Sequence, residues 1–160
     1  MRKLGAVAMV VGIGLVGCAD EPAGPIGDPA AARIAGADQG GRLLTADLTG
    51  EAEVPVGDLD GSGTARITLN QGQGTVCWEL EVADITLPAA AAHIHVAPAG
   101  VAGPIVVPLS APDATGSASG CTSAAADLIK AIRQDPAAYY VNVHNADHPP
   151  GAVRGQLAGN

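Results

Sequence analysis

The sequence predicts an all-β domain: an antiparallel β-sandwich or barrel of seven to eight strands, with one helix in a long connection. Three observations support this prediction. From residue 42 onward, apolar and polar residues alternate with a period of two. Twenty-two glycines and twelve prolines separate these short runs, as turns between strands do. One segment, residues 122–134, instead has apolar residues at helical spacing.

Seven segments alternate clearly enough to be predicted as strands. In chain order they are residues 43–49, 63–69, 75–85, 90–96, 105–109, 139–145 and 152–157. Residues 70–74 contain two glycines and are typical of a hairpin loop between two of these strands. The predicted helix of residues 122–134 begins at a Thr-Ser pair and ends before Asp135-Pro136.

The core has to be built almost without aromatic side chains, because only 2% of residues are aromatic and Phe is absent. We expect Val, Ile, Leu and Ala to fill it around Trp78, with Tyr139 and Tyr140. Residues 75–82 alternate strictly, so Trp78 faces this core and Cys77 lies on the opposite, polar face.

The first 17 residues have the features of an export signal. Arg2 and Lys3 precede an apolar run that ends at Gly17 and is too short to span a bilayer. Residues 15–18, Leu-Val-Gly-Cys, resemble the lipobox of bacterial lipoproteins, in which the cysteine is acylated. We therefore expect a lipoprotein signal peptide over 1–17 and a lipid on Cys18; an ordinary secretory signal is the alternative.

The remaining chain divides into a tether and one domain. Residues 18–41 are rich in Ala, Gly, Pro and Asp, so we expect a flexible tether there and the folded domain over 42–160. Without the signal peptide the chain loses two of its eight basic residues and none of its sixteen acidic ones, which gives a formal charge of −10. This charge argues against nucleic acid and anionic lipid head groups as partners.

Two cysteines remain once Cys18 is assigned to the lipid. Cys77 and Cys121 have only each other as partners in an oxidising compartment, so we expect a disulfide between them. Two free thiols are the alternative.

Histidines are the strongest candidates for a site. His93 and His95 are two residues apart on one strand and so share a face, while Ile94 points into the core. His144 ends a later strand, on the face opposite Val141 and Val143. Three neutral imidazoles suit copper or zinc. The alternative is that these histidines hydrogen-bond backbone and loops around a polar cleft.

Residues 44–157 resemble the CHRD domain, which occurs in microbial exported proteins and in the animal protein chordin. The motifs that carry this resemblance are residues 48–55, 60–65, 92–95, 100–106, 139–144 and 150–157. Chordin is an extracellular antagonist of growth factors, so the resemblance implies binding rather than catalysis.

The order of the histidines is also similar to that of copper–zinc superoxide dismutases. Those β-sandwiches bind copper through an H-x-H pair and a histidine late in the chain, before a glycine-rich turn and an arginine; the matching residues here are His93, His95, His144, Gly151 and Arg154. This similarity implies copper ligation and an Arg154 that steers an anion. The bridging histidine and the zinc ligands have no counterpart, although His148 or Asp147 could complete a site.

These patterns lead to one expectation and one alternative. We expect a non-enzymatic binding module, lipid-anchored to a membrane on the extracytoplasmic side of the cell envelope, that recognises a protein, a glycan or a small ligand. The alternative is a copper-binding protein with His93, His95 and His144 as ligands and no dismutase turnover.

Overall fold

The computed structural model describes residues 41–159, so the predicted signal peptide and nearly all of the predicted tether, Cys18 included, lie outside the described residues. Strands make up nearly half of the described chain. They are β1 (Arg42–Thr49), β2 (Ser62–Asn70), β3 (Thr75–Ala83), β4 (Ala91–Val96), β5 (Ile105–Leu109), β6 (Ser117–Ser123), β7 (Tyr139–His144), β8 (Val153–Gln156) and β9 (Ala158–Gly159). One helix, α2 (Ala126–Gln134), and a short 3-10 turn, η1 (Pro136–Ala138), lie between β6 and β7.

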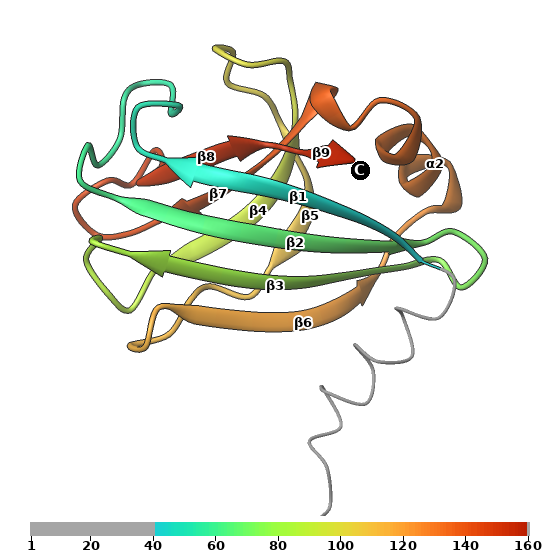
Figure 1. Ribbon diagram of the computed structural model, residues 1–160, viewed down its shortest axis with the longest axis horizontal. Coiled ribbons are helices and arrows are strands. Elements are labelled where there is room, and N and C mark those ends of the chain that lie inside the picture. The colour runs from blue at the N-terminus through green and yellow to red at the C-terminus, as the bar shows by residue number, and fades with distance from the viewer. Residues whose placement is uncertain (1–40, 160) are drawn as a thin grey trace, which may run out of the picture.

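The strands form one antiparallel sheet that curls into a nearly closed barrel (Figure 1). Its order is β5-β4-β7-β8-β1-β2-β3-β6, and β9 pairs with β1. The two edges of the sheet are β5 and β6; Pro108 in β5 suits an edge, because proline has no N–H to donate to a further strand. The predicted fold class, an all-β barrel with one helix, is confirmed.

Apolar side chains from every second residue fill the inside of the barrel. Leu44, Ile67 and Trp78 belong to this core, as do Ile94, Val141 and Val143 on the far wall. Helix α2 contributes Ile129 and Ile132, both fully buried, and lies at one end of the barrel (Figure 1). Burying a side chain of this size stabilises the fold by about 1.5–3 kcal/mol.

The long connection differs from the prediction at two points. Strand β6, which the sequence analysis missed, pairs with β3 along its whole length. The predicted helix start was wrong, because Thr122 and Ser123 are the last residues of β6 and α2 begins only at Ala126. β6 has the sequence SASGCTS, with no large apolar residue to reveal a period of two.

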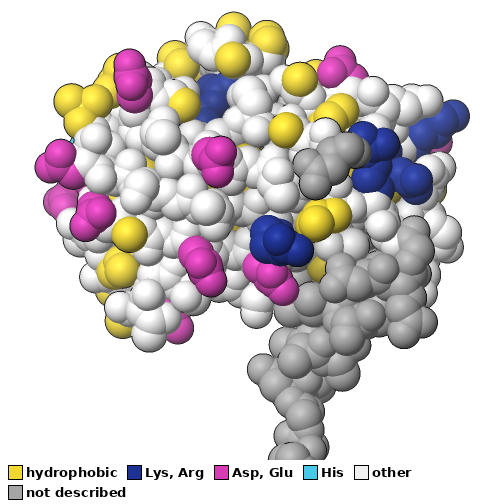
Figure 2. Space-filling model, in the orientation of Figure 1, with side chains coloured by type: hydrophobic (Ala, Val, Ile, Leu, Met, Phe, Trp, Pro, Cys, Tyr) yellow, Lys and Arg dark blue, Asp and Glu magenta, His cyan; other side chains and the backbone are white. Residues whose placement is uncertain are grey.

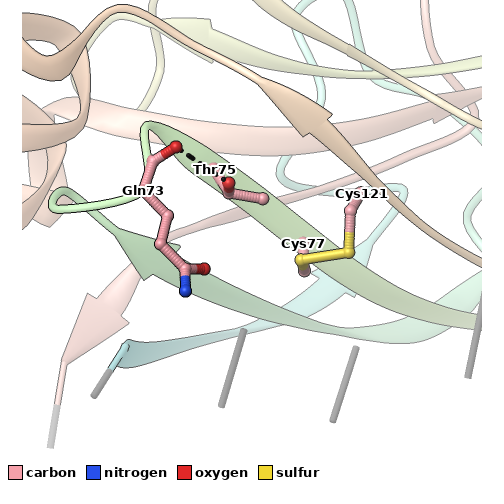
Figure 3. Close-up of a disulfide and its surroundings, with 4 residues drawn as sticks. All are labelled: Gln73, Thr75, Cys77 and Cys121. Carbon is pink, nitrogen blue, oxygen red and sulfur yellow. Dashed lines mark hydrogen bonds between the residues drawn. A yellow bond between two sulfur atoms is a disulfide. The ribbon is translucent and has the colours of Figure 1, made fainter. Parts of the chain in front are cut away.

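Cys77 and Cys121 lie directly opposite each other in β3 and β6 and form a disulfide (Figure 3). The predicted pairing is confirmed. Cys77 is on the outer face of β3, as its parity predicts, yet only 1% of its surface is exposed. The bond therefore fastens the edge strand β6 to the rest of the sheet.

The face shown in Figure 2 is the outside of β1, β2, β3 and β6. Acidic side chains are scattered over it and no histidine is visible there. Strands β4, β5 and β7 lie behind these strands in Figure 1, so the histidine-bearing wall is on the other side of the barrel. Within residues 41–159, no helix is long and apolar enough to cross a membrane.

Replacing both Cys77 and Cys121 by alanine should lower the free energy of unfolding by about 4 kcal/mol, because the bond closes a loop of 44 residues in the unfolded chain. Urea denaturation of the oxidised wild type and the double variant measures this difference. The reduced wild type is the control and should resemble the variant. Equal stability of all three proteins would show that the bond does not stabilise the fold.

Candidate metal centre

The candidate site lies on the outer face of strands β4, β7 and β8. Residues paired across antiparallel strands share a face, so the register defines three rows of outward side chains. They are Ala91–His144, His93–Asn142–Arg154 and His95–Tyr140–Gln156. The residues between them, such as Ile94 and Val143, face the core. One wall of the barrel is thus apolar inside and carries polar side chains outside.

Three histidines of this face converge. One ring nitrogen from each of His93, His95 and His144 lies within 4.8 Å of those of the other two. The ring centroids are 5.1 Å apart for His93 and His144 and 5.5 Å apart for His93 and His95. These are the three histidines predicted from the sequence, and the structure brings them together.

Backbone carbonyl groups define which nitrogen of two rings carries hydrogen. The Nδ1 atom of His95 lies 2.8 Å from the oxygen of Gly103, and the Nδ1 atom of His144 lies 2.9 Å from the oxygen of Pro149. A carbonyl oxygen only accepts, so each Nδ1 donates, and each neutral ring keeps its lone pair on Nε2. The expected hydrogen bonds to backbone and loops are present, but they use only one nitrogen of each ring.

His93 is directed at His144. Its Nδ1 atom lies 3.1 Å from Nε2 of His144. In the metal-free chain these two nitrogens therefore share one hydrogen atom in a hydrogen bond. Burial, followed by the proximity of His144 and His95, lowers the pKa of His93 to about 4. Burial also lowers the pKa of His144, against the hydrogen bond to Pro149. Both rings are therefore neutral at pH 7, as metal ligands need to be.

Nε2 of His95 is buried and has no hydrogen-bond partner in the described chain. The residue is 7% exposed. A buried lone pair without a donor costs about 1–3 kcal/mol of desolvation. Unpaired buried polar atoms are therefore uncommon, and a bound ion is one explanation for them. Together with His93 Nδ1 and His144 Nε2, it makes a set of three imidazole nitrogens that suits a transition-metal ion.

Arg154, for which the dismutase similarity implied anion steering, is bound to the loop between β4 and β5. Its guanidinium donates to the carbonyl oxygens of Val101 and Pro98 at 2.9 and 3.0 Å, and to the side chain of Gln156. The residue is only 2% exposed. These contacts hold the β4–β5 loop to the sheet.

His148 and Asp147 do not join the three histidines. His148 Nε2 lies 3.8 Å from a carboxylate oxygen of Asp58, and Asp147 accepts a hydrogen bond from Thr86. These contacts fix the loop that follows β7, which also supplies the Pro149 carbonyl to His144. The loop therefore orients the ring of His144 and adds no side chain to the cluster.

Tyr140 is buried as expected, with 3% of its surface exposed, but it lies on the outer face of the sheet and not among the side chains that fill the barrel. Tyr139 faces the core, and its neighbour consequently points outward. Period-two parity with Asn142 and His144 would have placed Tyr140 correctly.

Glu53, a 5% exposed carboxyl on the β1–β2 loop, was not predicted from the sequence. Burial raises its pKa, while Val54, Asn142 and Arg154 oppose that shift.

Comparison with known proteins gives one result for the domain that holds this site. Residues 44–157 match the family model described as CHRD domain. The matched range runs from β1 to the residue after β8, and so includes the three converging histidines and the loops that orient them. No curated protein matches the chain.

Proposed function

The chain belongs to the CHRD domain family, and we propose that it is a non-enzymatic binding module whose ligand is a transition-metal ion. The observation that carries this proposal is the convergence of His93, His95 and His144 within 4.8 Å. Hydrogen bonds from Nδ1 of two of these rings to carbonyl groups support it, because metal-binding histidines commonly donate their other N–H in this way.

Copper is the metal that this ligand set suits best. Neutral imidazoles bind both copper and zinc, but among divalent first-row ions the affinity of a given nitrogen site is highest for copper. A single metal would replace the proton between His93 and His144 and coordinate the unpaired Nε2 of His95. Three protein ligands leave a further coordination position for water or a small ligand.

We further propose that the domain sits outside the cytoplasmic membrane on a lipid attached to Cys18. The sequence of residues 15–18 supports the lipid, and the Cys77–Cys121 disulfide supports the compartment, because such bonds persist where the surroundings are oxidising. His93 and His144 are partly exposed on the outer wall of the barrel, so the site would take its ligand from that compartment.

Copper titration of the purified full chain tests the metal proposal. We expect one equivalent of copper to bind, and His93→Ala, His95→Ala and His144→Ala each to weaken binding by at least about 100-fold, because a ligand is lost. His148→Ala is the control, since it removes the fourth histidine, which is outside the cluster, while the loop keeps the Thr86–Asp147 hydrogen bond and the bond from the backbone N–H of residue 148 to Asn145; it should change the affinity by less than about threefold. Elemental analysis gives the stoichiometry and competition with a chelator gives the affinity.

Absence of stoichiometric copper would contradict the metal proposal, as would an equal loss of affinity in all four histidine variants. The second result would mean that copper binds to scattered surface histidines. Urea denaturation of each variant shows whether lost binding reflects lost structure.

Cys18→Ser tests the anchor. The wild-type chain should be found in the membrane fraction with an acyl-modified N-terminal cysteine, because two or three acyl chains anchor a protein stably. The variant should be released from that fraction with no added lipid mass. Intact-mass spectrometry of both fractions makes the comparison, and wild-type protein without lipid would contradict the proposed anchor.

A further inference from the structure

We infer that Tyr140, acting with Gly103, is a positioning residue for the metal site: it fixes the ring of His95 so that Nε2 is free to bind the metal. The inference rests on the proposed function, because only a metal-binding His95 needs a fixed Nε2. The orientation of the His95 ring is nevertheless measurable without any metal. Neither residue is among the three ligands.

Tyr140 and His95 are stacked. Their ring centroids are 4.7 Å apart and their planes differ by only 6°. The guanidinium carbon of Arg154 lies 3.4 Å from the centroid of the same tyrosine ring. Two flat groups at these distances fit only on opposite faces of the ring, so Tyr140 is enclosed between a cation and an imidazole. A cation over an aromatic face is attractive, which keeps the tyrosine ring in the plane that His95 stacks on.

The peptide group of Gly103 contacts both members of this stack. Its N–H donates to the hydroxyl oxygen of Tyr140 at 3.1 Å, and its carbonyl oxygen accepts from Nδ1 of His95 at 2.8 Å. A side chain at this position would not fit, since a Cβ atom would lie 2.1 Å from the carbonyl oxygen of Val96. Glycine therefore allows the loop to approach closely enough to bond both rings.

The loop that carries Gly103 is itself held to the sheet by side chains of β8. Arg154 donates to the carbonyl groups of Val101 and Pro98, and Gln156 donates to that of Ala97. Both side chains come from β8, the strand next to Tyr140. The contacts to His95 are thus made by a fixed loop and not by a free one.

The consequence is a single orientation of His95. Stacking on Tyr140 sets the plane of the ring, and the bond to Gly103 sets which edge faces the loop and which nitrogen carries hydrogen. Nε2, which is buried and has no donor within the described chain, then faces away from the loop. A free imidazole ring would turn to satisfy that nitrogen; this one is prevented from doing so.

Three variants of the full chain separate positioning from simple packing. Tyr140→Leu removes the stacked ring, Tyr140→Phe keeps the ring and removes only the hydroxyl, and Tyr139→Leu removes the adjacent tyrosine, which faces the core. Nitrogen-15 NMR of the metal-free proteins reports the tautomer of His95. Copper titration and the electron paramagnetic resonance spectrum of bound Cu(II) report the site.

We expect wild type and Tyr140→Phe to hold His95 with hydrogen on Nδ1 alone and to bind copper with affinities within about threefold of each other. Tyr140→Leu should give a mixture of tautomers, an altered Cu(II) spectrum and an affinity about 10- to 100-fold lower. Tyr139→Leu should lower the stability of the fold and leave the tautomer and the spectrum unchanged.

An unchanged tautomer and affinity in Tyr140→Leu would overturn the inference, as would equal changes in Tyr140→Leu and Tyr139→Leu. If the wild type binds no copper, the proposed function is contradicted. If His95 nevertheless has a single tautomer in the wild type and a mixture in Tyr140→Leu, the positioning role is still supported. The two claims therefore fail separately.

Discussion

The pairing of β4 with β7 is the constraint on which the rest of the structure depends. Its register runs from Ala91 opposite His144 to Val96 opposite Tyr139, and it decides which side chains share a face. Ile94, Val141 and Val143 complete the core on one side of this strand pair, while the histidines converge on the other. A shift of one residue in either strand would bury polar side chains in the barrel and expose the core. The hydrophobic effect that stabilises the fold therefore also fixes the distances within the candidate site.

Loops convert this polar face into a site with defined chemistry. Imidazoles on a bare sheet would hydrogen-bond water and turn freely. Here the β4–β5 loop and the β7–β8 loop each present one carbonyl oxygen to one ring, from Gly103 and Pro149. Burial keeps His93 neutral, as its pKa of about 4 indicates. Removing the imidazole nitrogens from water lowers the stability of the metal-free fold. A bound metal ion would offset that loss of stability.

Sequence patterns predicted the fold and which three histidines converge, but not what orients their rings. Strands such as β1 to β4 and the faces of His93, His95 and His144 follow from a period of two, because burial of alternate residues decides them. Strand β6 has too few large side chains to show that period. Gly103 and Pro149 contact the histidines through backbone carbonyl oxygens. Their positions depend on loop conformation, which the side-chain types of the loop do not predict. Arg154 shows the same limit: the dismutase similarity implied that it steers an anion, whereas its burial and its contacts to loop carbonyls follow from tertiary packing.

X-ray absorption spectroscopy at the copper edge of the copper-loaded full chain tests the central claim most directly, because it counts the imidazoles bound to the metal. The account predicts three imidazole nitrogens around one copper ion, supplied by His93, His95 and His144. A first shell of oxygen atoms, or one with a single imidazole, would place the metal on surface carboxylates or on His148 and contradict the account.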